Sequence, residues 1–550
     1  MRRATGERSV LVAVRSAVAL YRLLDVLPVF AGDPRVHRHF TLVPGSEFDV
    51  DALAAVDAAG ARTLPWDAAR RRSFDLVLTA SPKGALQLLR GERVLLPHGA
   101  GFGKTVPSEG SAAFASGLDP AYLDTGDGAL ALYALAHPDQ VADLAARSPA
   151  LADRARVTGD PTLERLLAAR PLRDRYRAAL GTGGRRLVVL TSTWGPESLL
   201  RRRPELARDL LAHLPCDEYQ VALIVHPNER SRMGRYELRQ HLAPALDAGL
   251  VLPGPYEEWA AVLVAADAAV CDHGSTALYF AAVGGDRPLV GAYDGGGELL
   301  PGSPVATLLE QVPHLRHPSD LRQALAAYRP GTAAAAARAA FAEQGRALSH
   351  LQRELYALLG LTPPPGPVEA RPLPVPGPAP RTVAAFDVHA EVTGGAVRVT
   401  RVPGGLGPAG HHLAAEHGAA GERATRTAAV LYRRPQPAPA APHASAWRAD
   451  AWTAHVLDSY PAARVAAALL DAGRGLLRLR DGSLHTLRLA PHTHNGRLEY
   501  ADPAAAVSAL HAWHTLHGAL PAGRLDCLLG EHAFRLTLEQ PTAHDRAHPV

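Results

Sequence analysis

The stretch AAVCDHGSTALYFAAVGG (Ala268 to Gly285) contains the order of elements that decides the fold class. Its apolar start, up to Cys271, has the length of a buried strand. A polar Asp-His-Gly loop follows, and Ser275 then opens an apolar run with the length of a helix. Ser is favoured at helix starts because its side chain accepts a backbone N–H. The stretch therefore predicts a strand, a polar loop and a helix, which is the unit of a parallel α/β sheet.

The same order recurs over the first 360 residues of the chain. Further strands are predicted at Ser9 to Val14, His39 to Gly45, Phe74 to Ala80, Glu92 to Gly99, Ala155 to Thr158, Arg185 to Gly195, Tyr219 to Glu229, Gly249 to Gly254 and Asp286 to Gly297. Helical patterns separate many of them, which indicates βαβ units. Asp160 and Pro161 suit the start of a helix, so we place the crossover between two domains near them. We expect an α/β fold of two facing Rossmann-like domains, at residues 1–158 and 159–360.

The remaining 190 residues divide into a linker and a smaller domain. Residues 362–381 read TPPPGPVEARPLPVPGPAPR, and this much proline excludes a helix or sheet interior. Residues 361–381 are therefore predicted to be an extended, semi-rigid linker. Residues 382–550 contain short strand patterns (AVRVTRV, GLLRLRDG and HTLRLAP) and two Ala-rich helices. They predict an accessory α+β domain, whose role the sequence does not define.

Composition excludes several classes of function. The chain has 58 basic and 54 acidic residues and a net charge of +4, which does not indicate a nucleic-acid binder. Three scattered cysteines argue against a disulfide framework. The apolar run near the N-terminus is too short for a signal peptide, and no run approaches the roughly 18 apolar residues of a spanning helix. We expect a cytoplasmic protein and leave open a peripheral contact with the inner face of the membrane.

Two polar loops follow predicted strands, one in the first domain and one after the first strand of the second domain. In Pro97-His98-Gly99-Ala100-Gly101-Phe102-Gly103-Lys104-Thr105, glycines allow backbone N–H groups to approach an anion, and Lys104 adds positive charge. His98 has a side chain that can accept a proton near neutral pH. The loop is not a P-loop, because the first glycine of that motif is replaced by His98 and no clear helix follows. The second loop, around Thr193, offers hydroxyl groups at a strand end; a capped turn would explain it equally well.

Two more polar loops follow strands of the second predicted domain. In the first, His226 ends a strand and Arg230 is placed to bind phosphate oxygens. In the second, Asp272 and Gly274 lead into a helix that starts at Ser275 and Thr276, whose free N–H groups and dipole suit a pyrophosphate. Each loop could also be a structural turn or an ordinary helix cap. Their shared position carries the hypothesis, because ligands of parallel sheets lie beyond the carboxyl ends of the strands.

The C-terminal domain is rich in histidine. His511, His514 and His517 are spaced for one face of a helix, but no acidic partner lies nearby in the sequence. We therefore predict no metal site and no cofactor.

These motifs resemble those of the CDP-glycerol glycerophosphotransferases of teichoic-acid synthesis, within the GT-B glycosyltransferase superfamily. That family has a W-H-G-T-P-L-K loop, to which Pro97-His98-Gly99 and Lys104 are similar. Its P-T-W-R element is similar to Ser192 to Gly195, and its R-x-H-P element to His226-Pro227. Its T-D-Y-S-S element is similar to Cys271 to Thr276, and its G-x-P crossover to Val157 to Pro161. The resemblance covers roughly residues 90–300. Here Trp is missing before His98, the spacing to Lys104 is one residue longer, and Gly195 replaces Arg.

The resemblance implies a transferase with a GT-B-like fold, in which a nucleotide-diphosphate donor is a substrate. His98 would act as base on an acceptor hydroxyl, while His226 and the helix start at Ser275 and Thr276 would stabilise the leaving diphosphate. The acceptor would be a polyol, a lipid-linked molecule or a glycan of the cell envelope. Two alternatives stay open: a nucleotide-sugar glycosyltransferase or 2-epimerase of the same fold, and a non-catalytic descendant that binds a nucleotide, or a partner protein through residues 382–550.

Overall fold

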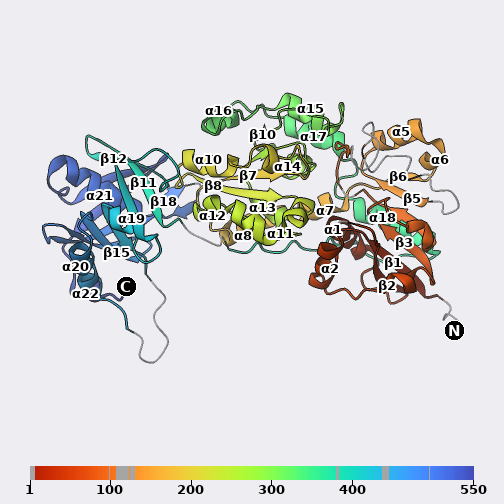
Figure 1. Cartoon of the computed structure of the whole chain (residues 1–550), viewed down its shortest axis with the longest axis horizontal. Helices are drawn as coiled ribbons and strands as arrows, with labels where there is room; N and C mark the ends of the chain where they lie inside the picture. Colours follow the sequence, from red (N-terminus) through yellow and green to blue (C-terminus); the bar gives the residue numbers. More distant parts are fainter. Residues whose placement is uncertain are drawn as a thin grey trace.

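The computed structural model describes residues 6–46, 48–97, 99–106, 115, 123, 130–378, 383–435, 445–494 and 496–550. Three units follow one another along the long axis of the molecule, with the first domain at one end and a β-barrel at the other (Figure 1). Within the described part of the chain, no helix is both long and apolar enough to cross a membrane.

The first domain is built on a six-stranded parallel sheet with the order β2-β1-β3-β4-β5-β6. Its strands are β1 (Arg8–Val14), β2 (Val36–Leu42), β3 (Ser73–Thr79), β4 (Arg90–Leu95), β5 (Leu130–Leu135) and β6 (Ala155–Val157). Its helices are α1 (Ala17–Val26), α2 (Asp49–Ala58), α3 (Trp66–Ala69), α5 (Pro138–Arg147) and α6 (Pro149–Ala152). The five residues from Val10 to Val14 are all buried, as expected for a strand covered on both faces.

The second domain has a four-stranded parallel sheet with the order β10-β9-β7-β8. Its strands are β7 (Arg186–Ser192), β8 (Tyr219–Val225), β9 (Ala268–Cys271) and β10 (Leu289–Gly291). The helices that follow the crossover are α7 (Pro161–Ala168), α8 (Arg173–Ala179), α9 (Leu199–Arg202), α10 (Leu206–His213), α11 (Pro227–His241), α12 (Ala243–Asp247), α13 (Glu258–Ala265), α14 (Thr276–Val283), α15 (Pro304–Gln311), α16 (Leu321–Ala326) and α17 (Thr332–Ala340). The predicted fold of two Rossmann-like domains is therefore confirmed.

Three details of the α/β domains differ from the sequence-based expectations. Residues 249–254 were expected to form a strand, but only an isolated bridge between Val251 and Ala222 forms there, because Pro253 lacks the N–H that would extend the pairing. Strand β5 was not predicted, since its Ala- and Leu-rich sequence has little β-propensity. Helix α18 (Ala347–Leu359) was assigned to the second domain, but its apolar face packs in the core of the first.

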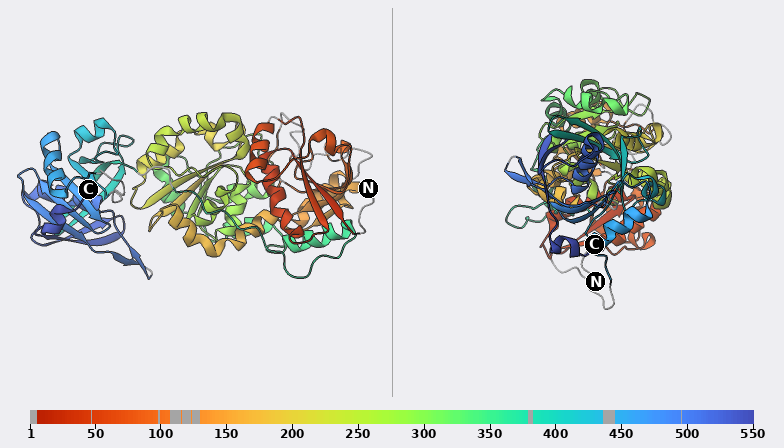
Figure 2. Two further views of the ribbon diagram at one scale, coloured as in Figure 1. Left: turned by 90° about the horizontal axis from the view of Figure 1, so that it is seen from below. Right: turned by 90° about the vertical axis from the view of Figure 1, so that its left-hand side faces the viewer.

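The C-terminal unit is a closed barrel of nine strands with the order β11-β12-β20-β21-β17-β16-β15-β14-β13. Its elements are β11 (Ala385–Thr393), β12 (Ala396–Pro403), β13 (His412–Glu416), α19 (Glu422–Thr427), β14 (Val430–Arg433), α20 (Ala449–Ser459), β15 (Val465–Asp471), β16 (Arg474–Leu479), β17 (Leu484–Leu489), α21 (Pro503–His517), β20 (Arg524–Leu529), β21 (His532–Glu539) and α22 (Ala543–Ala547). A separate hairpin consists of β18 (His492–His494) and β19 (Arg497–Glu499). The left view of Figure 2 shows the barrel beside the second domain and away from the first. Arg401 of β12 joins it to that domain by an ion pair with Asp217.

Helix α21 forms part of the barrel core, and its first nine residues are buried. The ring of His511 lies 4.7 Å from that of His412, measured between centroids. Nδ1 of His511 and Nε2 of His412 have no hydrogen-bond partner within the described residues. Burial lowers the pKa of His412 to about 3 and that of His511 to about 4. Both side chains are therefore neutral in the folded barrel at any pH where the protein is ordinarily handled.

This histidine pair predicts a loss of stability in mild acid. Both folded pKa values lie below the unfolded value of about 6.5, so only the unfolded chain binds protons at these histidines as the pH falls below 6.5. The free energy of unfolding is therefore highest above pH 6.5 and declines as the pH falls toward 4. We expect the free energy of unfolding to fall by about 4 kcal/mol between pH 7 and pH 5, roughly 2 kcal/mol from each histidine, as measured by urea titration of the full chain. The double variant His412→Leu/His511→Leu should flatten this dependence. The variant of exposed His241, His241→Gln, should leave it unchanged, and equal slopes for all three proteins would contradict the assignment.

Candidate functional site

A cavity lies between the two α/β domains, at the carboxyl ends of the strands of the second sheet. One wall is a face of α1, formed by Val18, Tyr21, Arg22 and Asp25 at the spacing of successive helical turns. The other wall consists of the ends of β7 and β8 and the starts of α11 and α14, and Leu373 of the proline-rich segment also lines the cavity. This is the position at which ligands bind in parallel α/β sheets.

The start of α14 faces this cavity. Ser275 and Thr276 both line it, and both are partly exposed. Their backbone N–H groups have no acceptor within the described residues, because the first helical hydrogen bonds at this end begin at Ala277. The positive end of a helix dipole and unpaired N–H groups together favour an anion. Both residues lie at the start of α14 and line the cavity, while their binding of a donor stays a prediction.

Arg230 of α11 brings a positive charge to the same cavity. Its guanidinium donates to the carbonyl oxygens of Val225, at 3.2 Å, and Pro253, at 2.9 Å. No carboxylate within the described residues forms an ion pair with it. Burial lowers the pKa of Arg230 to about 10, and the nearby carboxylates of Glu258 and Asp51 oppose this shift. An anionic ligand would stabilise the buried charge further.

The ring of His226 is oriented by the start of α11. Its Nδ1 accepts a hydrogen bond from the backbone N–H of Asn228 at 3.1 Å, which caps the helix. A neutral ring with Nδ1 as acceptor carries its proton on Nε2. His226 lines the cavity, so the geometry fits a hydrogen-bond donor better than a general base.

Asp272, Thr193 and Gly274 build the loops behind the cavity and do not line it. The carboxylate of Asp272 accepts from the backbone N–H groups of Thr193 (2.8 Å), Leu199 (2.9 Å) and Gly274 (3.0 Å). Burial raises the pKa of Asp272, against the three N–H donors that lower it. A Cβ at Gly274 would lie 3.0 Å from that of Thr193. The expected contact of Asp272 with a donor is thus replaced by a scaffolding role, because backbone N–H groups occupy its carboxylate. Thr193 and Gly274, also expected to contact a donor, lie beside Asp272 and outside the lining of the cavity.

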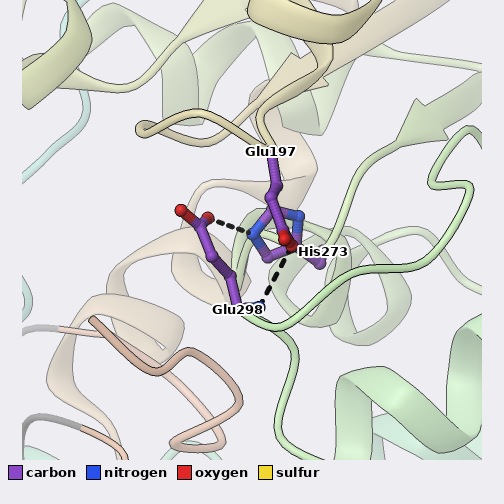
Figure 3. Close-up of side chains that lie close together, drawn as sticks. All are labelled: Glu197, His273 and Glu298. Atoms are coloured by element: carbon purple, nitrogen blue, oxygen red, sulfur yellow. Dashed lines mark hydrogen bonds and ion pairs between the residues drawn. The ribbon is translucent and has the colours of Figure 1, made fainter. Parts of the chain in front are cut away.

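Figure 3 shows Glu197, His273 and Glu298, three members of a cluster that joins the two domains. Lys104 belongs to this cluster and is also away from the cavity. Its ammonium lies 2.7 Å from Oε2 of Glu298, and the same oxygen lies 3.0 Å from Nε2 of His273. Burial raises the pKa of Glu298, but the hydrogen bonds from His273 and Lys104 outweigh it and lower the pKa. Glu197 lies close enough to complete a cation site with His273 and Glu298, yet the Lys104 ammonium already supplies a cation there. Lys104 was expected to bind an anionic donor; its charge is used by Glu298 instead.

His98 lies outside the described residues, and its neighbours on both sides are described. The carbonyl oxygen of Pro97 accepts a hydrogen bond from Nε of Arg22 at 2.8 Å. A Cβ placed on Gly99 would be 3.3 Å from Oγ of Ser275. The chain on either side of position 98 is therefore held at the cavity and at the start of α14.

Several cavity residues were missed by the sequence analysis. The charged residues of α1, Arg22 and Asp25, interrupt an otherwise apolar helix on one face, and this signal was available in the sequence. Tyr256 stacks on Tyr21 with ring centroids 5.1 Å apart, and its φ of 77° is a strained conformation for a bulky residue. Glu257 follows it and also lines the cavity. No motif marks either of these two residues.

The chain thus consists of two α/β domains with a candidate ligand cavity between them, followed by a β-barrel. The chain matches no protein-family model and no curated protein sequence. Solved structures similar to it include a variant of the wall teichoic acid polymerase TagF (12% identity, 65% of this chain and 90% of that chain, TM-score 0.47). Others are Anabaena HepE in complex with UDP-glucose (14%, 64% and 100%, 0.40) and S. aureus MnaA with UDP (9%, 66% and 99%, 0.42).

Proposed function

We propose that the chain is a transferase that binds a nucleotide-diphosphate donor in the interdomain cavity. It would move a glycerophosphate-like or glycosyl group from this donor to an acceptor hydroxyl. The observation that carries the proposal is Arg230, a largely buried cation that lines the cavity and whose hydrogen-bond acceptors among the described residues are two carbonyl oxygens. The same cavity receives the unpaired N–H groups of Ser275 and Thr276. A diphosphate matches both groups in charge and in hydrogen-bonding capacity.

The chemistry of transfer follows from what each group can do. Charge develops on the diphosphate as its bond to the transferred group breaks. The N–H groups at the start of α14, the Arg230 guanidinium and the ring of His226 all border the cavity and would stabilise that charge. His98 is proposed to take the proton of the acceptor hydroxyl. Positioning of donor and acceptor would supply much of the remaining rate.

A non-catalytic nucleotide-binding protein is a second candidate, and the structure around Gly195 favours it. Gly195 stands where the resembled family has Arg. A side chain there would meet Glu298, at 2.9 Å from its Cβ, and Lys104, at 3.2 Å. The family's arginine is therefore absent and its space filled by a neutralised pair. Binding of a nucleotide without turnover would identify this function.

An epimerase is disfavoured by the state of the carboxylates at the cavity. Asp25 and Glu257 line it, and both are paired with arginines. Acid and base catalysis at a sugar carbon needs carboxylates that exchange protons readily.

Arg230→Ala is expected to raise the Kd of a nucleotide diphosphate about 10- to 100-fold, because one charge-assisted contact is lost. Arg230→Lys should recover part of the affinity, since it keeps the charge but not the planar fork. Calorimetry with UDP, CDP and GDP measures the effect. Turnover is tested with CDP-glycerol, CDP-ribitol and several nucleotide sugars.

Arg353→Ala is the control, because Arg353 is an exposed arginine of α18 that does not line the cavity. It should bind as the wild type does. If the wild type binds none of the three diphosphates, the proposed function is wrong. If it binds and turns over none of the donors, the non-catalytic alternative holds.

A further inference from the structure

The proline-rich segment after α18 is a structural part of the molecule and not a free tether. It contains neither helix nor strand from residue 361 to residue 378, as the sequence predicted. It runs along the second domain toward the barrel (Figure 1). Val368 and Ala370 pack on the core of the first domain, and Leu373 is buried in the core of the second. Leu373 also lines the ligand cavity, so the segment contributes to its wall.

Arg165 of α7 fixes the backbone of this segment. Its guanidinium donates to the carbonyl oxygens of Arg371, at 2.7 Å, and Pro372, at 2.8 Å. Arg165 is only 4% exposed and also pairs with Asp25, at 3.0 Å, and Glu257, at 2.7 Å. A buried arginine with four such partners leaves the segment little freedom at the point where it reaches the cavity.

Arg371 completes a group of four charges at the edge of the cavity. It forms ion pairs with Oε1 of Glu257 and, at 3.5 Å, with Asp25. Two carboxylates thus face two guanidinium groups. Oε1 of Glu257 accepts from both arginines, while Oε2 has no donor within the described residues. One carboxylate oxygen at the cavity is therefore left for a ligand.

We propose that the proline-rich segment is a wall of the ligand site and that Arg371 is a positioning residue, which holds Glu257 in place for a hydrogen bond from the ligand. The inference rests on the proposed nucleotide-diphosphate site and adds to it a residue from outside the two α/β domains. It also gives the segment a function beyond spacing, since the wall of the site and the connection to the barrel are one stretch of chain.

Removing Arg371 leaves Asp25 and Glu257 facing the single guanidinium of Arg165. Burial raises the pKa of Glu257, and the two arginines outweigh it and lower the pKa, so Arg371→Ala should move it upward. Asp25 shares both arginines with Glu257, and burial raises its pKa. The phenol of Tyr21 also lies near Glu257, and burial raises its pKa to about 12. It stays neutral throughout. Affinity that depends on ionised Glu257 should then decline at a higher pH in the variant than in the wild type.

The experiment is calorimetric titration of the full chain with the nucleotide diphosphate that the wild type binds, from pH 5 to pH 8. Arg371→Ala should raise Kd about 10-fold and shift the acidic decline of affinity upward by about one pH unit. Arg371→Lys should restore Kd to within about threefold, and Arg353→Ala should match the wild type. Arg371→Gln serves as a second variant if the alanine protein does not fold.

The outcomes separate the two proposals. If the wild type binds and Arg230→Ala does not, but Arg371→Ala and Arg371→Gln bind as the wild type does, the positioning role is wrong and the proposed function stands. An affinity loss with an unshifted pH profile, or with no rescue by lysine, also overturns the role. If the wild type binds no diphosphate, both proposals fall together.

Discussion

Arg22→Ala is expected to lower the free energy of unfolding by about 3–5 kcal/mol, a cost typical of breaking a buried ion pair. Arg22 is 5% exposed and Asp160 is 3% exposed. Two parallel hydrogen bonds join them, at 2.6 Å and 2.7 Å, from the two terminal nitrogens of Arg22 to the two oxygens of Asp160. Alanine would leave the Asp160 carboxylate buried without its cation. Most of the expected loss is the cost of that unpaired charge.

The same arginine connects the two domains and the loop of His98. Nε donates to the carbonyl oxygen of Pro97, and Nη1 donates to Oγ1 of Thr162 at 2.7 Å. Asp160 also caps α7 through the N–H of Leu163 and accepts from the hydroxyl of Tyr279. The change therefore loosens the crossover, the start of α7 and the chain before position 98 at once.

Calorimetry and urea unfolding of the full chain measure the effect. The free energy of unfolding is taken from the transition in which the α/β domains unfold. Arg353→Ala, a change of the same type at an exposed position, should stay within about 0.5 kcal/mol of the wild type. The double change Arg22→Met/Asp160→Leu should recover much of the loss, because no buried charge remains. Equal stability of the Arg22→Ala and Arg353→Ala proteins would falsify this view of the crossover.

The sequence predicts the two α/β domains well because a parallel sheet needs continuous apolar strands. β1, β7 and β8 are such runs, and each was recognised within a residue or two of its start. The closure of the barrel was not predicted. Its strands pair across long separations, such as β12 with β20 and β17 with β21, and alternation within a strand does not identify its neighbour.

The candidate site was predicted in part. His226, Arg230, Ser275 and Thr276 line the cavity as expected, because strand ends and helix starts fix where their backbone lies. Residue type did not reveal which charged side chains already have hydrogen-bond or ion-pair partners within the protein. Asp272 binds three backbone N–H groups and Lys104 binds Glu298, and both uses depend on loops that meet only in the folded chain.

For the proline-rich segment, the sequence predicts the conformation of the chain but not its contacts. Its composition correctly indicated an extended chain, and the same composition suggested a spacer. Arg371 and Leu373 are ordinary residues of a proline-rich sequence, and their place at the cavity results from Arg165, which lies about 200 residues earlier in the chain. Long-range contacts of this kind leave no local pattern.

His98→Ala is expected to lower the rate of group transfer about 10²- to 10⁴-fold, the range for loss of a general base. The described chain on both sides of position 98 is held at the cavity, through Pro97 to Arg22 and through Gly99 beside Ser275. Histidine has a pKa near neutrality, which suits a base that must take a proton from an acceptor hydroxyl. The donor is bound by other groups, so its Kd should stay within about twofold of the wild type.

Single-turnover rates with the donor that the wild type uses, together with calorimetric Kd values, separate these two effects. The wild-type rate should fall as the pH drops through the pKa of the base, and the His98→Ala rate should lose that dependence. His37→Ala is the control, because His37 is an exposed histidine of the same domain. A rate close to that of the wild type, or a large rise in Kd without a change in rate, would show that position 98 binds the donor or supports the loop and that another group accepts the proton.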